Sequence, residues 1–354
     1  MAYTTIDNPE LHFQVKIYTG NGSNNNAKTF DGDSDMQPDM VWIKSRSASE
    51  NGHIFDSVRG ANKRLLSVDY SQEFDDASNL QSFDSDGFTL GTADGINKNT
   101  ATFVCWAWKA GTTGSGTTTG SGTGQSYSYS VNTTAGFSIM TYTGNGTANH
   151  TIPHHLGSTP EWFWVKIRSG DNNNWGTYHH KSNANPEQYA LYLDGTSAAT
   201  DDIFMNDVAP TSSVINLSGG NYGNVNTNTY VSHCWSEVKG FSKFGSYLGN
   251  GNANGAFVYT GFRPAWIMIK NASSGSTSWL MYDNKRPGYN DDTAYLLASS
   301  NDVEASDKDI DILSNGFKIR INNSENNTDG DSYVYMAFAE SPFVNSNGVP
   351  TNAR

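Results

Sequence analysis

Ile17-Tyr18-Thr19-Gly20-Asn21-Gly22 is the stretch that decides the fold. It returns as Thr141-Tyr142-Thr143-Gly144-Asn145-Gly146 and again as Ser246-Tyr247-Leu248-Gly249-Asn250-Gly251. Gly and Asn adopt positive φ at low cost, so an aromatic residue followed by Gly-Asn-Gly indicates a strand that runs into a tight turn. Similar sequence follows each copy, which identifies the chain as one structural unit written three times.

Two further landmarks recur in the same order in each copy. An apolar strand ends in lysine and follows a proline, which suits the start of a strand; the three examples are Asp39–Lys44, Glu161–Lys166 and Ala265–Lys270. An aromatic strand closes each copy, at Thr102–Lys109, Tyr230–Lys239 and Tyr333–Glu340. Short apolar segments between Gly-, Asn- and Ser-rich turns predict an all-β protein of three tandem antiparallel β-sandwich domains.

We expect each domain to hold roughly 100 to 120 residues and to bury its own core. The predicted boundaries are residues 1–111 for the first sandwich with its lead-in, 112–134 for a linker, 135–240, 241–341, and 342–354 for a polar tail. Residues 111–125, at the start of this linker, read GTTGSGTTTGSGTGQ, a composition typical of flexible spacers. The first domain is therefore expected to be tethered, whereas the second and third adjoin directly. The best helix candidate is Ala61–Phe74.

Charge and composition exclude some classes of partner. A formal net charge of −13 disfavours nucleic acid and anionic membranes. The first residues have no basic and apolar signal pattern, and no apolar run reaches the length of a membrane span. Cys105 and Cys234 are placed at the same position of two closing strands, which predicts buried free thiols in separate domains rather than a disulfide.

Residues suited to catalysis or metal binding are scattered. Glycosidases need two positioned carboxylates, and the nearest acidic cluster, Glu304–Asp311, precedes a turn, so we predict no enzyme activity. His154 and His155, like His179 and His180, are adjacent and would point to opposite faces of a strand, which disfavours zinc. No cofactor is predicted, but calcium stays open at three Asp/Asn-rich loops, which are Asp31–Asp35, Asp171–Asn174 and Asp329–Asp331.

Four aromatic residues are the candidate contacts for a glycan or a protein partner. Trp175, Tyr178, Trp279 and Tyr282 follow the lysine-ended strands in the more variable segment. Their rings suit stacking on a sugar or a partner. Packing in the core is the alternative, and it is the commoner role of such residues.

Six runs carry a resemblance to a known family: Trp42–Ser47, Asp56–Ala61, Ser82–Gly91, Trp106–Gly111, Glu237–Tyr247 and Ala337–Phe343. Together they resemble virion structural proteins of marine bacteriophages, which are often tail-fibre-like and carry concanavalin A-like lectin or glucanase folds. The resemblance covers nearly the whole chain. The resemblance implies jelly-roll domains and a virion component that is assembled in the host cytoplasm, and it supplies no catalytic residues.

The expected function is a phage virion structural protein of the tail-fibre or appendage type. Its partners would be other virion proteins, copies of itself and host surface glycans. The alternatives are a capsid decoration protein and a carbohydrate-binding lectin without a virion role; a polysaccharide depolymerase is disfavoured by the missing carboxylate pair.

Overall fold

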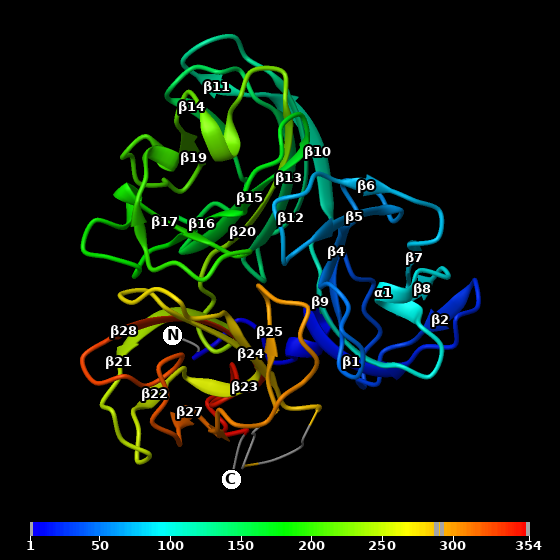
Figure 1. Cartoon of the computed structure of the whole chain (residues 1–354), viewed down its shortest axis with the longest axis vertical. Coiled ribbons are helices and arrows are strands. Elements are labelled where there is room, and N and C mark those ends of the chain that lie inside the picture. Colours follow the sequence, from blue (N-terminus) through cyan, green and yellow to red (C-terminus); the bar gives the residue numbers. More distant parts are fainter. Residues whose placement is uncertain (1–2, 287–289, 291–293, 352–354) are drawn as a thin grey trace.

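The computed structural model describes residues 3–286, 290 and 294–351, and its regular secondary structure is almost all strand. All ladders between named strands are antiparallel. The sheets follow the repeats, one large and one three-stranded sheet for each. Figure 1 shows the repeats as three lobes, blue, green and yellow to red. The all-β, antiparallel prediction is confirmed.

The large sheets share one strand order. In repeat 1 the order is β1 (Phe13–Thr19), β9 (Thr102–Trp108), β3 (Met40–Ser45), β4 (His53–Asp56), β5 (Lys63–Leu66) and β6 (Phe74–Asp75). In repeat 2 it is β10 (Thr112–Thr117), β12 (Ser126–Asn132), β13 (Phe137–Thr143), β20 (Thr229–Trp235), β15 (Trp162–Ser169), β16 (Gly176–His179), β17 (Tyr189–Tyr192) and β18 (Thr200–Asp201). In repeat 3 it is β21 (Ser242–Leu248), β28 (Ser332–Pro342), β23 (Phe262–Asn271), β24 (Leu280–Asp283) and β25 (Leu296–Leu297).

The small sheets cover one face of each large sheet. They contain β2 (Asn26–Lys28), β8 (Gly87–Leu90) and β7 (Leu80–Asp84); β11 (Thr119–Gly120), β14 (His150–Pro153) and β19 (Val214–Leu217); and β22 (Phe257–Tyr259), β27 (Gly316–Ile319) and β26 (Ile310–Leu313). The helical elements are single turns, namely η1 (Pro9–Leu11), α1 (Asp94–Asn97), η2 (Pro186–Gln188), η3 (Ile203–Met205) and η4 (Asn221–Gly223).

Each residue of the recurring Gly-Asn-Gly turn has its own physical role. In repeat 1 a Cβ on Gly20 would lie 2.3 Å from the Lys98 carbonyl oxygen, and Gly22 has a φ of +66°. The main-chain N–H of Asn21 donates to Oδ1 of the buried Asn97 at 3.0 Å. The same bond recurs in the other repeats, from Asn145 to Asn224 at 2.8 Å and from Asn250 to Asn327 at 3.0 Å.

The lysine-ended strands are buried on both faces. In β3, Val41 and Ile43 pack into the interior of the repeat 1 sandwich, whereas Trp42 belongs to a cluster with residues of all three repeats. The Trp42 ring lies 5.9 Å from Trp164 of repeat 2 and 6.5 Å from Trp266 of repeat 3, measured between centroids. We call this shared cluster the central core. It explains why these strands read as continuous apolar runs rather than as alternating ones.

The central core adds an element that the predicted domain organisation lacks. Repeats 1 and 2 each bury a core of their own between their two sheets, and the three repeats also share the central core. The segment predicted as a linker is not a tether: β10 and β12 extend the large sheet of repeat 2, and β11 extends its small sheet. A flexible Gly/Ser/Thr composition therefore forms strands here, since tyrosines of β12 lie over Gly114 and Gly116 of β10 and supply the packing that glycine lacks.

Two smaller predictions are also decided. The helix expected over residues 61–74 is wrong, because this segment forms β5 and the start of β6. The two cysteines are buried free thiols, as predicted. They are not equivalent, however: strand register places Cys105 at the position of Ser232, and Cys234 at the position of Ala107.

Candidate functional site

The four aromatic residues predicted as surface contacts are all buried, so they cannot stack on a glycan in this structure. A second repeat covers Trp175 and Trp279, whereas Tyr178 and Tyr282 pack within their own repeats. Three of them donate to main-chain oxygens: Trp175 Nε1 to Leu66 at 2.8 Å, Trp279 Nε1 to Tyr192 at 2.8 Å and Tyr282 Oη to Lys308 at 2.7 Å. The first two bonds cross between repeats, and Tyr178 packs on Phe163 within repeat 2. Core packing, the alternative weighed from the sequence, is the role they have.

A buried chain of charged groups joins repeat 2 to repeat 1. Arg168 of repeat 2 contacts Glu73 of repeat 1 at 2.9 Å, and Glu73 also contacts Arg59 at 3.2 Å. Arg59 Nε lies 2.5 Å from Oδ2 of Asp56, and this same oxygen lies 3.1 Å from Nε2 of His233 in repeat 2. This series of charged contacts therefore begins at Arg168 in repeat 2, continues through repeat 1 and ends at His233 in repeat 2.

The same arrangement joins repeat 1 to repeat 3. Arg46 of repeat 1 contacts Glu304 of repeat 3 at 2.8 Å, and Glu304 contacts Arg286 at 3.2 Å. Arg286 contacts Asp283 at 2.7 Å, and Asp283 accepts a hydrogen bond from the indole N–H of Trp106 at 3.0 Å. Glu304, which belonged to the acidic cluster in the sequence, thus bonds across an interface instead of forming a solvated loop.

The third interface uses histidine where the other two use aspartate. His179 occupies the position of Asp56 and Asp283 in the strand register. Its Nε2 lies 3.2 Å from the main-chain oxygen of Tyr335 in repeat 3. In each interface the closing strand of one repeat contacts the strand that follows the lysine-ended strand of another repeat. Repeat 2 contacts repeat 1 in this way, repeat 1 contacts repeat 3, and repeat 3 contacts repeat 2, so the three repeats form a closed ring.

The hydrogen bonds of His233 define its protonation state. The indole N–H of Trp164 donates to Nδ1 at 2.8 Å, so the proton of the neutral ring lies on Nε2 and faces Asp56. Burial lowers the pKa of His233, and Asp56 only partly offsets this effect. Burial alone would raise the pKa of Asp56, but Arg59 and His233 lower it well below its usual value. The pair is therefore a carboxylate with a neutral histidine at neutral pH.

The lysines that end the landmark strands are inter-repeat contacts. Lys44, Lys166 and Lys270 are fully buried, and each ammonium group donates to a main-chain oxygen of the next repeat. The acceptors are Ser300 at 2.5 Å, Asp69 at 3.1 Å and Thr196 at 3.3 Å. Burial lowers the pKa of each of the three lysines to about 8.

The sequence motifs examined for metals have structural partners. His150 bonds Asn224 through Nδ1 and Thr118 through Nε2, both at 2.7 Å, and His154 Nε2 lies 3.0 Å from the main-chain oxygen of Thr211. Within residues 3–286, 290 and 294–351, no group of three or more His, Cys, Asp or Glu side chains is placed to hold a metal ion. That the protein needs no cofactor stays a prediction, and calcium binding stays open.

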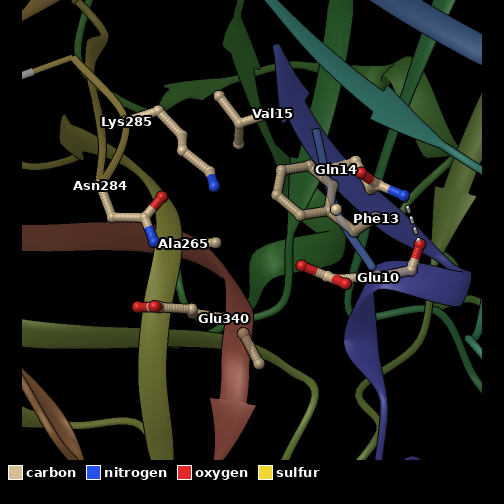
Figure 2. A pocket seen from close by; sticks show the side chains of 10 residues that line it. Glu10, Phe13, Gln14, Val15, Ala265, Asn284, Lys285 and Glu340 are labelled. Atoms are coloured by element: carbon tan, nitrogen blue, oxygen red, sulfur yellow. Dashed lines mark hydrogen bonds between the residues drawn. The ribbon is translucent and has the colours of Figure 1, made fainter. Parts of the chain in front are cut away.

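Surface hollows occur at three equivalent places, where the edge strand of one repeat meets the next repeat. Between β1 and repeat 3 lies a cavity of about 70 Å³, with Lys285 and Asn284 facing Phe13 and Val15 (Figure 2). The hollow at Asp39 and Lys109 of repeat 1, beside β12, measures about 400 Å³. The hollow at His180 and Lys181 of repeat 2, beside β21, measures about 370 Å³. Because they border edge strands, these hollows are the candidate interaction sites.

Sequence reasoning missed the residues that join the repeats. One signal was visible, since Asp-x-x-Arg occurs at Asp56–Arg59 and at Asp283–Arg286, directly after equivalent strands. The partners Glu73 and Glu304 have no fixed spacing from these pairs, so their role emerges only from the packed structure.

Comparison with known proteins gives one match. Residues 8–342 match the model of a family described as a domain of unknown function (DUF7483). No curated protein and no solved structure matches the chain. Among the helices of the described residues, none has the length and apolar character to cross a membrane. The family model spans all three repeats, in agreement with a single packed body, and the chain belongs to the DUF7483 family.

Proposed function

We propose that this protein is a structural component of the exterior of a bacteriophage virion, assembled in the host cytoplasm. The observation that carries the proposal is the closed ring of repeats, which forms one block with a shared core and leaves strand edges at its surface. The resemblance of the sequence runs to marine phage virion proteins supports the same assignment. Its partners would be other virion proteins and copies of itself, with host surface glycans as a further contact.

The buried charged groups support a structural rather than a catalytic role. Asp56, Asp283 and His233 have fully buried side chains that are bonded across repeat interfaces. A catalytic acid or base has to reach its substrate, whereas these groups hold the repeats together. We therefore keep the assignment of a non-enzymatic protein within the proposal.

Attachment to the tail and attachment to the head are both compatible with a compact block. The expectation of a tail fibre or appendage relied partly on a tethered first domain, and repeat 1 is instead docked on the other two. A capsid decoration protein is therefore the second candidate.

Purified particles of a phage that encodes this chain test the proposal. Mass spectrometry should find the chain in particles at stoichiometric levels, and gold-labelled antibodies should place it on the tail or on the head. Its absence from particles, with abundant protein in the infected cell, would contradict the proposal.

A further inference from the structure

Repeat 2 has a covering arm, residues 112–132, that pairs with both of its sheets. Strand β12 adds to the outer edge of β13 in the large sheet, and β11 adds to β14 in the small sheet. Thr119 of the arm bonds Thr151 of β14 through their hydroxyl groups at 2.8 Å. The arm thus closes both edges of this sandwich at one end.

No described residue pairs as a strand with the equivalent edges of repeat 3. Strands β21 and β22 correspond to β13 and β14, and each is the terminal strand of its sheet among the described residues. Three apolar side chains are exposed here: Leu248 at 65%, Phe257 at 48% and Tyr259 at 51%. Register places Phe257 at the position of Thr151, which the arm covers in repeat 2. The exposed rings therefore lie where a covering strand would lie.

The hollow beside β21 has room for side chains of such a strand. Its volume is about 370 Å³, and its walls include Tyr247, Phe257 and Tyr259. Gly245 occupies the position that Met140 has in repeat 2, where Tyr129 of the arm pairs with it. The ring of Tyr335 covers Gly245, since a Cβ there would lie 2.6 Å from the Tyr335 hydroxyl, and Tyr335 also lines the hollow. An incoming tyrosine at the position of Tyr129 would therefore contact the Tyr335 ring.

We propose that repeat 3 binds an extended segment of a partner protein, which adds as a strand to β21 and covers β22. The segment would resemble the arm: uncharged, rich in Gly, Ser and Thr, with tyrosine at alternate positions. In strand addition the main chain supplies affinity and alternate side chains supply specificity. A second copy of this chain is a poorer occupant, because each copy has a net charge of −13. The inference does not depend on the virion assignment.

The open edge of repeat 1 is less suited to strand addition. Lys16 of β1 forms an ion pair with Asp31 at 2.5 Å, and Lys28 ends β2. Charged side chains on edge strands are a common protection against pairing.

One hydrogen bond defines which groups of β21 face outward. Nε2 of His180 lies 2.7 Å from the main-chain oxygen of Phe244, on the side away from β28. Main-chain groups alternate along a strand, so those of Ser246 and Leu248 also face the open edge. The incoming strand would pair with these two residues, beyond the carbonyl that His180 already occupies.

A synthetic peptide of residues 112–134 tests the proposal on the full chain by hydrogen–deuterium exchange. At millimolar peptide, exchange should slow severalfold in β21 and β22. Ser246→Pro removes one outward-facing N–H, which edge strands tolerate, and should abolish this protection. The matched variant Ser246→Ala keeps the N–H and should retain it. Phe257→Glu, at an exposed position, should weaken protection without affecting the fold.

Three results would overturn the proposal. The first is that hydrogen exchange in β21 and β22 does not slow at millimolar peptide. The second is that Ser246→Pro shows the same protection as the wild type. The third is that protection is confined to β13 and β14, which would mean that the peptide replaces the covering arm of repeat 2. A peptide-free dimer that dissociates in Ser246→Pro would assign the edge to a second copy instead.

Discussion

At the residue scale, the turn asparagines explain why Gly-Asn-Gly is a reliable landmark. Asn224 uses its whole amide: Nδ2 donates to the carbonyl oxygens of Thr147 at 2.9 Å and Ser218 at 2.8 Å, and Oδ1 accepts from the N–H of Asn145. Asn97 and Asn327 are bonded in the same way in the other repeats. The turn sequence recurs because the side chain of a buried asparagine, distant in the sequence, forms hydrogen bonds with the main chain of the turn.

We predict that Asn224→Ala lowers the free energy of unfolding by about 2–4 kcal/mol, because buried donors and acceptors lose their partner. Urea denaturation measures the loss. Asn99→Ala, at an exposed position, is the matched control and should cost less than about 0.5 kcal/mol. A loss below about 1 kcal/mol for Asn224→Ala would mean that water replaces the amide.

The buried lysines predict that stability rises from pH 7 to pH 9. Their folded-state pKa of about 8 lies below the unfolded value of about 10.4. In this window the unfolded chain binds more protons than the folded one, so the free energy of unfolding increases with pH, by about 1 kcal/mol per lysine. Urea midpoints across the window measure the rise, which the triple variant of Lys44, Lys166 and Lys270 to methionine should lose.

The buried thiols reduce this rise. Burial raises the pKa of Cys105 and Cys234, so above the unfolded thiol value of about 8.5 the unfolded chain loses protons that the folded one keeps, which offsets part of the gain from the three lysines. A wild-type stability that is flat or falling between pH 7 and pH 9 would contradict the assignment of charged, buried lysines.

At the element scale, one side chain anchors the covering arm. The hydroxyl of Thr118 is buried, lies 2.7 Å from Nε2 of His150 and accepts the N–H of Gln125 at 2.8 Å. Sequence alone gave no reason to expect this, because the Gly/Ser/Thr composition of the arm is the one that flexible linkers have. Strand formation depends on partners distant in the sequence, namely β13, β14 and the tyrosines of β12.

We predict that Thr118→Val loosens the arm and lowers the free energy of unfolding by about 1–3 kcal/mol, since it leaves buried polar groups unpaired. Limited proteolysis with an enzyme of broad specificity should then cut within residues 112–125. The exposed neighbour provides the control, because Thr117→Val should leave the cleavage pattern unchanged. Equal resistance of both variants would show that main-chain pairing alone holds the arm.

At the scale of the whole molecule, the three repeats could be predicted from the sequence, but their packing around a shared central core could not. Turns and fold class follow from local patterns, because they depend on neighbours in the chain. The central core depends on which second face each sheet buries, and the signal for it was the unbroken apolar run in strands such as Trp162–Val165. The same oversight placed Trp175 and Trp279 at the surface, because the repeat that covers each one is distant in the sequence.

The shared core predicts that the three repeats unfold as one unit. Trp42 contacts tryptophans of all three repeats, so opening one repeat exposes the inner faces of the other two. Thermal unfolding should show a single transition, with coincident midpoints by tryptophan fluorescence and by circular dichroism.

A chain that ends after residue 240 lacks Trp266 and Phe338 and should not fold cooperatively. The control is Trp42→Phe in the full chain, which keeps an aromatic ring and should lower the midpoint while preserving one transition. Two or three separate transitions in the full chain, or a cooperative transition in the shortened one, would show that the repeats are independent domains after all.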